Sequence, residues 1–208
     1  MKTLSLISLS ILINIFLFNN IFAQDTIYYT GFENVEIETL NFTTPSINGE
    51  KGWDYTSTNN AMLDFNTFNY NGNKSVCLAA ASANVSPNAI NYLTLTADPT
   101  SYSNINLSFY IFFNSEEQND NDKLWIRGDE DSEWIEATTF QNDNIEGWRN
   151  ITIYNIEDLL ADNNQNISNN TQFRFGQEDN YDFLGGDGLI IDDVTITGFA
   201  IPKAEAKK

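Results

Sequence analysis

The sequence predicts an all-β protein, an antiparallel β-sandwich of the jelly-roll type. Short runs rich in β-branched and aromatic residues recur along the chain, and clusters of Asn, Asp, Gly and Ser separate them. Within the run 123–127, Leu124 and Ile126 occupy alternate positions, as in a strand with one buried face. Only Ile156–Ala161 has a helical pattern, a single turn between strands. Many short strands with aromatic-rich cores are typical of sandwiches and jelly rolls.

The individual strands follow from the same pattern. The segment Asn104–Phe113 begins by alternating and ends as a continuous apolar run, which is the pattern of a strand that passes into the middle of a sandwich. In order along the chain, the predicted strands are Thr26–Glu33, Gly52–Thr56, Ala61–Phe65, Lys74–Ala80, Asn91–Thr96, Asn104–Phe113, Lys123–Arg127, Trp134–Phe140, Trp148–Tyr154, Thr171–Gln177 and Gly188–Phe199.

The first 23 residues have the composition of a secretory signal peptide. Lys2 supplies a basic start, Leu4 to Phe18 an apolar stretch, and Ala23 a small residue at a cleavage site before Gln24. The apolar stretch is too short for a transmembrane helix. We therefore expect an exported protein without membrane insertion, in which residues 24–200 form a single sandwich domain and residues 201–208 a polar tail.

Composition excludes several classes of function. The formal net charge is −19, which opposes binding to nucleic acid but suits hard cations that prefer oxygen ligands. The chain contains no histidine, which excludes Ser-His-Asp catalysis, Cys-His catalysis and histidine-ligated zinc. Cys77 is the single cysteine, so the domain contains no internal disulfide, and its apolar neighbours predict a buried thiol.

The segment Gly185–Ile196 carries two adjacent aspartates, Asp192 and Asp193, inside a β-branched run. Neighbouring residues of a strand point to opposite faces, so we expect one of these carboxylates to point inward. A carboxylate in that position needs a cation, an arginine or several N–H donors to offset its desolvation. The segment is therefore a candidate metal site.

The order of landmarks along the chain resembles a known family. Gly31-Phe32-Glu33 is followed by Gly52-Trp53, residues 72–78, residues 107–110, residues 122–126 with Trp134, residues 147–151, Phe173-Arg174-Phe175 and residues 188–194. This succession resembles the MAM-like jelly rolls and the related cleaved-adhesin ("choice-of-anchor") domains of secreted bacterial proteins, over Tyr28 to Thr197. The paired cysteines of animal MAM domains are missing, and residues 128–134 are a degenerate form of the family's aspartate-rich hairpin. The Asn-rich composition is similar to that of Bacteroidetes secreted proteins.

The resemblance implies a non-catalytic domain for adhesion, or for binding carbohydrate or a cell-surface protein. It also implies a cation where the first and last strands meet, and Glu33 and Asp193 match those positions, with Asp192 as the alternative. Calcium fits best because it accepts irregular shells of six to eight oxygen ligands, which Asp54 and Asp64 could complete. The competing interpretation is that Glu33 pairs with Arg174 or caps a turn while one aspartate faces solvent.

Aromatic residues suggest a second kind of site, a platform on which sugar rings stack. Trp125 is the candidate for an exposed face because it alternates against Leu124 and Ile126. Asp122 and Tyr181, each in an acidic cluster, are the further candidate ligand-binding residues. The competing interpretations are that the tryptophans pack within the sandwich and that the acidic clusters are solvated loops. Other candidate platform residues are Trp53, Trp134, Trp148, Tyr55, Tyr70 and Tyr102.

Two alternative functions remain open. A glycoside hydrolase would need two carboxyls about 5–5.5 Å apart across a cleft, and Asp129, Asp131 and Glu133 alternate as such acids do. Their position beside Gly128 favours a solvated hairpin turn instead. A structural protein that self-associates through free edge strands is the other alternative. The predicted function is a secreted, calcium-stabilised adhesion or carbohydrate-binding domain.

Overall fold

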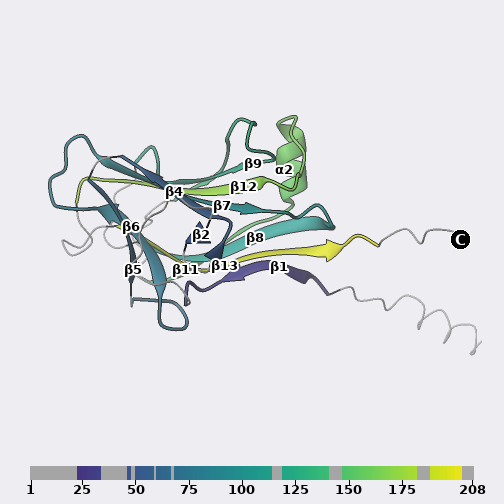
Figure 1. The fold of residues 1–208 in the computed structure, drawn as a ribbon, viewed down its shortest axis with the longest axis horizontal. Helices are drawn as coiled ribbons and strands as arrows, with labels where there is room; N and C mark the ends of the chain where they lie inside the picture. The colour runs from purple at the N-terminus through teal and green to yellow at the C-terminus, as the bar shows by residue number, and fades with distance from the viewer. Residues whose placement is uncertain are drawn as a thin grey trace, which may run out of the picture.

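A computed structural model describes residues 23–33, 46–47, 50–58, 60–66, 68–113, 119–140, 147–181 and 188–202. Two antiparallel β-sheets pack face to face in this part of the chain, as Figure 1 shows. The predicted all-β jelly-roll sandwich is confirmed. The predicted signal peptide up to residue 22 and the tail from residue 203 lie outside the described residues.

One layer is a six-stranded sheet. Its central strand β13 pairs with β8 on one side, and on the other side with β6 near its start and with β1 near its end. The sheet order is β11 (Arg149–Ile153), β8 (Tyr102–Phe113), β13 (Leu189–Ala200), β6 (Ser75–Ala80) and β5 (Ala61–Asn66), with β1 (Asp25–Thr30) beside β13.

The second layer is a five-stranded sheet in which β12 lies between β9 and β7. Its order is β10 (Ile135–Thr139), β9 (Lys123–Arg127), β12 (Thr171–Asp179), β7 (Ala89–Ala97) and β4 (Trp53–Ser57). A separate pair, β2 (Ser46–Ile47) with β3 (Glu50–Lys51), was not predicted because two residues carry no alternation to detect.

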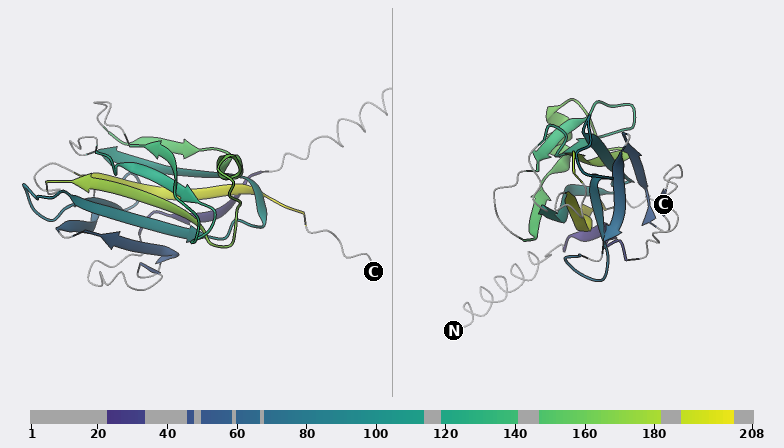
Figure 2. Two further views of the ribbon diagram at one scale, coloured as in Figure 1. Left: turned by 90° about the horizontal axis from the view of Figure 1, so that it is seen from above. Right: turned by 90° about the vertical axis from the view of Figure 1, so that its left-hand side faces the viewer.

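The predicted strands match the observed ones closely, and the prediction for β9 has the observed bounds. The predicted helical turn is α2 (Ile156–Asp162), which lies at one end of the sandwich (Figures 1 and 2). Ile156 and Leu160 are buried one helical turn apart. The Glu157 carboxylate accepts the Ile105 N–H at 2.9 Å, which ties the helix to β8.

The core lies between the two sheets. Trp53 is fully buried there, and its indole N–H donates to the Tyr28 hydroxyl at 2.6 Å. Phe32 and Phe175 contact the same ring with centroids 5.6 and 5.9 Å away. Packing is therefore the role of Trp53. Other core residues include Leu78, Leu93, Leu107, Phe109, Ile126, Phe173, Ile191 and Ile196.

The last strand is interrupted by a β-bulge at its two aspartates. Ile191 faces the core before the bulge and Val194 faces it afterwards. Between them, Asp193 adopts a left-handed conformation with φ of 49°. Because the bulge adds one residue, the apolar side chains on both sides of it reach the same core. Asp192 therefore lies on the outer side of the six-stranded sheet, where it is nevertheless fully buried.

Cys77 is buried, as predicted. It does not lie in the main core but packs with Ala79 and Ile190 in a small apolar cluster. Alternation along β6 explains this position, since its neighbours Val76 and Leu78 face the main core.

Candidate functional site

The outer surface of the five-stranded sheet combines aromatic and polar side chains. On β9 and β12, alternate residues such as Leu124 and Phe173 face the core, so the residues between them face outward. We call this surface the five-stranded face and define it by Tyr92, Asn121, Lys123, Trp125, Arg127, Trp134, Glu136, Gln172, Arg174 and Glu178.

The Trp125 ring lies over Gly176 of the neighbouring strand β12. A Cβ atom on Gly176 would lie 2.3 Å from Cζ3 of the indole, so only glycine leaves room for the ring there. Tyr92 meets the indole edge-on, with centroids 5.8 Å apart and an interplanar angle of 72°. Trp125 is half-buried, which agrees with the prediction that it faces outward.

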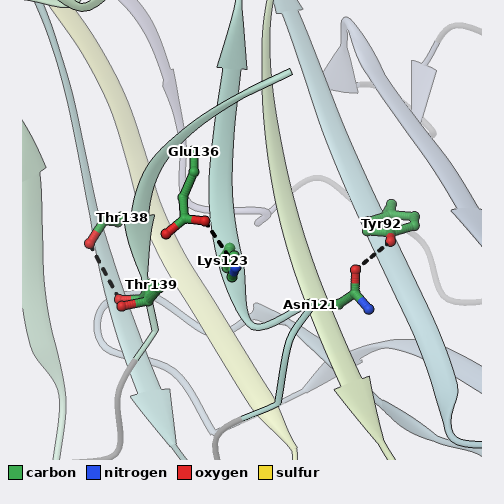
Figure 3. A network of polar contacts seen from close by, with 6 residues as sticks. All are labelled: Tyr92, Asn121, Lys123, Glu136, Thr138 and Thr139. Carbon is green, nitrogen blue, oxygen red and sulfur yellow. Dashed lines mark hydrogen bonds and ion pairs between the residues drawn. The ribbon is translucent and has the colours of Figure 1, made fainter. Parts of the chain in front are cut away.

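Hydrogen bonds fix the polar groups around these rings. The Tyr92 hydroxyl donates to the Asn121 amide oxygen at 2.7 Å, and the Asn121 amide nitrogen donates to Glu178 at 2.8 Å. Lys123 and Glu136 form an ion pair of 2.9 Å nearby, as Figure 3 shows. Desolvation raises the pKa of Tyr92, so its hydroxyl stays protonated and keeps donating to Asn121.

Two guanidinium groups lie over the ring of Trp134, which precedes β10. The Arg127 Cζ lies 4.3 Å from the ring centroid, and the Arg174 Cζ lies 3.9 Å from it. Arg174 also lies 5.0 Å from the Tyr92 ring. Desolvation and then the charge of Arg127 lower the pKa of Arg174. Tyr92, Arg127 and Arg174 were not among the predicted ligand-binding residues, although Arg127 alternates with Leu124 and Ile126 in the sequence.

The other two predicted ligand-binding residues lie elsewhere. Asp122 is 1% exposed, and its carboxylate accepts the N–H groups of Asn119 and Glu178. Desolvation raises its pKa to about 7. It therefore holds the segment before β9 in place instead of facing solvent. Tyr181 is exposed just beyond β12, and its carbonyl accepts the Ala80 N–H of the other sheet.

The predicted metal residues Glu33, Asp192 and Asp193 come together where β1 and β13 meet, and we call them the acidic junction. Glu33 Oε1 accepts the N–H groups of Asn73 and Lys74 at 2.7 and 3.0 Å. Although desolvation acts to raise the pKa of Glu33, these N–H groups lower it overall. Glu33 therefore caps the turn that precedes β6.

Asp192 and Asp193 accept the other hydrogen bonds of this junction. Asp192 Oδ2 accepts the N–H groups of Tyr70 and Asn71 at 2.9 and 3.2 Å, and Oδ1 accepts the Asp193 N–H at 2.7 Å. Buried Asp192 thus has the several N–H donors that its desolvation requires, and desolvation still raises its pKa to about 6. Asp193 accepts the Tyr29 hydroxyl at 2.6 Å.

The three carboxylates of the junction lie close enough to act on one phenol. The hydrogen bond to Asp193, then desolvation, then the charges of Asp193, Asp192 and Glu33 raise the pKa of Tyr29 to about 12. Within the described residues, no group of three or more acidic, cysteine or histidine side chains is arranged to hold a metal ion. The fourth predicted ligand, Asp54, is exposed on β4 of the other sheet, opposite Thr94.

A second aromatic surface covers the outer side of the six-stranded sheet. We call it the six-stranded face and define it by Phe68, Tyr70, Tyr110, Phe112 and Trp148. Its rings contact one another: Phe68 stacks on Trp148 at 5.9 Å, and Tyr70 stacks on Tyr110 at 3.4 Å. Phe68 and Tyr70 come from the loop that the acidic junction holds.

The carboxylates considered for glycoside hydrolysis lie in the turn between β9 and β10. Asp131 and Glu133 are exposed, and the Ser132 N–H donates to the Asp129 carbonyl oxygen at 3.1 Å. This is the solvated hairpin turn that the sequence favoured.

No family model and no curated protein sequence matches the chain. Its fold is similar to those of solved structures, among them the following two. One is the CBM22-1 xylan-binding domain of Paenibacillus barcinonensis Xyn10C, with 12% identity, a TM-score of 0.50, and coverage of 86% of this chain and 98% of that one. The other is the K2 cleaved adhesin domain of Lys-gingipain, with 13% identity, a TM-score of 0.50, and coverage of 84% and 99%.

These likenesses confirm a sandwich of the adhesin and carbohydrate-binding-module type at the level of fold, while the MAM-like assignment stays a prediction. In the described part of the chain, no helix has the length and apolar character needed to cross a membrane.

Proposed function

We propose that this protein is a secreted, non-catalytic domain that binds carbohydrate through the five-stranded face. The observation that carries the proposal is the position of Trp125, whose ring lies over Gly176 and is bordered by Tyr92 and by fixed amide and carboxylate groups. Secretion rests on the signal-peptide pattern of residues 1–23. The shared fold of a xylan-binding domain supports the choice of ligand class.

The chemistry of the face suits a sugar. A pyranose ring presents C–H groups that pack on an indole, and hydroxyl groups that need donors and acceptors around it. Asn121 and Glu178 are already oriented by hydrogen bonds, so little side-chain freedom is lost when a ligand binds.

A non-catalytic role is supported by where the carboxylates lie. On the five-stranded face, Glu136 is paired with Lys123, and Glu178 accepts hydrogen bonds from Asn88 and Asn121. Neither is poised as a free acid or nucleophile opposite a second carboxyl. The acidic residues 129–133 lie in a solvated turn.

The test is retention on a panel of immobilised polysaccharides, with two tryptophan variants compared. Trp125→Ala should weaken binding at least about tenfold, as expected for a central aromatic contact. Trp148→Ala, on the opposite face, is the matched control and should bind like wild type. Equal loss in both variants, or retention on no glycan by wild type, would contradict the proposal. Assembly that grows with protein concentration without glycan would favour the structural alternative.

We further propose that calcium binds at the acidic junction and stabilises the sandwich. The position of the three carboxylates around Tyr29 supports this, and the charge of Asp193 helps to raise the pKa of Asp192, a repulsion that a hard cation relieves. Since these carboxylates already accept N–H groups, carbonyl oxygens and water would have to complete the shell. Millimolar calcium should raise the melting temperature and EDTA should reverse the rise. An unchanged melting curve would contradict calcium binding at the acidic junction.

A further inference from the structure

The cationic side chains of this acidic protein are unevenly distributed. The chain has a formal net charge of −19 and only three arginines. Two of them, Arg127 and Arg174, lie side by side on the five-stranded face, on paired strands β9 and β12. An acidic surface repels anions in general, so a local pair of guanidinium groups makes this face the exception.

Both guanidinium groups are fixed by neutral partners. Arg127 donates from Nε to the Gln172 amide oxygen at 2.7 Å and from Nη1 to the Ser132 carbonyl oxygen at 3.2 Å. Arg174 donates from Nε to the Thr94 hydroxyl at 3.4 Å. In the described part of the chain, the one ion pair is Lys123–Glu136, so neither arginine forms an ion pair with a carboxylate there, although the charge of Asp54 acts on Arg174.

This arrangement leaves donors available. A guanidinium has five N–H donors, and the contacts above use two on Arg127 and one on Arg174. Both groups lie over the Trp134 ring, within 4.3 Å of its centroid, so the two guanidinium groups and their unused donors are held together at one place on the five-stranded face. Two like charges held at one ring repel each other, and an anion that binds both removes that repulsion.

We propose that the carbohydrate recognised by this protein is anionic, with a carboxylate or sulfate group bound by Arg127 and Arg174 beside Trp134. A guanidinium group can donate two parallel hydrogen bonds to a carboxylate or to a sulfate. These hydrogen bonds are strengthened by the opposite charges, and a neutral sugar has no charged group to accept them. This inference rests on the proposed carbohydrate-binding function and specifies its ligand class. Cation–π packing alone, without any anionic ligand, is the competing explanation for the two arginines.

The experiment compares polysaccharides that differ in charge but not in backbone. Affinity is measured for polygalacturonate against its methyl ester, and for dextran sulfate against dextran. Wild type should bind at least one charged member about tenfold more tightly than its neutral partner, and added salt should weaken that binding. The two pairs show whether carboxylate or sulfate is preferred.

Variants then assign the preference to the two arginines. Arg127→Gln and Arg174→Gln should each reduce the preference about tenfold, and Arg174→Lys should retain part of it. Lys74→Gln makes the same change in net charge at the acidic junction and should retain the full preference. Melting curves establish that each variant is folded.

The outcomes separate this inference from the proposed function. If neutral glycans bind through Trp125 and methyl esterification changes nothing, the anionic ligand is wrong and carbohydrate binding stands. If Lys74→Gln lowers the preference as much as Arg174→Gln does, general charge is responsible and the arginine site is wrong. If no glycan of either kind binds, both are wrong.

Discussion

The two outer faces of the sandwich carry aromatic residues that are held in different ways. On the five-stranded face, Trp125 packs over Gly176 and against Tyr92, and Trp134 packs against two guanidinium groups. On the six-stranded face, the rings pack against one another. The loop that carries Phe68 and Tyr70 is held by the carboxylates of Asp192 and Glu33. Aromatic content alone therefore does not distinguish the two faces, and the partners of the rings do.

The largest expected effect is a loss of stability as the pH rises, because each face depends on a buried carboxylate. The pKa of Asp122 is raised to about 7 and that of Asp192 to about 6, above the ordinary 3.8. The folded state thus binds these protons more tightly than the unfolded state. Stability present at low pH is lost as the pH rises from about 4 to about 7. Urea denaturation should show a loss of roughly 4 kcal/mol between pH 5 and 8.

Asparagine variants separate the two contributions to this pH dependence. In a plot of the free energy of unfolding against pH, Asp192→Asn should flatten the part below pH 6, and Asp122→Asn should flatten the part up to pH 7. A stability that rises from pH 5 to 8, or a slope that neither variant changes, would contradict the assignment.

The next effect concerns the loop of the six-stranded face. Asp192→Ala leaves the N–H groups of Tyr70 and Asn71 without their acceptor and should lower the free energy of unfolding by about 2–3 kcal/mol at pH 8. Glycan binding by the folded variant should be unchanged, because Asp192 lies on the opposite sheet. Loss of binding without loss of stability would show that the two faces are not independent.

A smaller loss of stability is expected at the centre of the five-stranded face. Gly176→Ala places a Cβ 2.3 Å from the Trp125 ring and 2.5 Å from the Asn121 carbonyl oxygen, so the indole must move. Overpacking of this kind costs about 1–3 kcal/mol, and displacement of the indole should weaken glycan binding as Trp125→Ala does. Denaturation and retention assays on the same sample measure both. Full glycan binding by this variant would show that the position of Trp125 over Gly176 is not needed for binding.

The smallest effects come from two single hydroxyl groups. Tyr29→Phe removes the 2.6 Å hydrogen bond to Asp193, and Tyr92→Phe removes the 2.7 Å hydrogen bond to Asn121. Each should cost about 1 kcal/mol of stability. Only Tyr92→Phe should weaken glycan binding, since only Tyr92 orients a group on the five-stranded face. Weaker glycan binding by Tyr29→Phe, with unchanged binding by Tyr92→Phe, would contradict the assignment of glycan binding to the five-stranded face.

Local sequence patterns predicted most of the fold. Alternation along 123–127 placed Leu124 in the core and Trp125 outside it. The adjacent aspartates of the last strand indicated a desolvated carboxylate that needs several donors, but the prediction that it points inward was wrong, because the buried Asp192 lies on the outer side of the sheet. The bulge at Asp193 was not predicted, because it depends on a left-handed backbone that the pattern does not reveal.

The candidate site was less predictable because its contacts are distant in sequence. Arg127 and Arg174 meet at Trp134 only because β9 pairs with β12, which is not its neighbour along the chain. The loop of the six-stranded face is held by Glu33 and Asp192, which lie 40 residues before Asn73 and 122 residues after Tyr70. Asp122 was selected for its acidity, but burial gives it a structural role.

The most direct test uses the four tryptophans as reporters, because each occupies a different environment. Trp53 is in the core, Trp148 is on the six-stranded face, and Trp125 and Trp134 are on the five-stranded face. Their indole N–H resonances can be followed by NMR while a retained glycan is titrated into the protein. We expect the indole resonances of Trp125 and Trp134 to shift together while those of Trp53 and Trp148 stay unchanged. A shift of Trp148 with Trp125 and Trp134 unchanged would contradict this expectation and move the binding site to the opposite sheet.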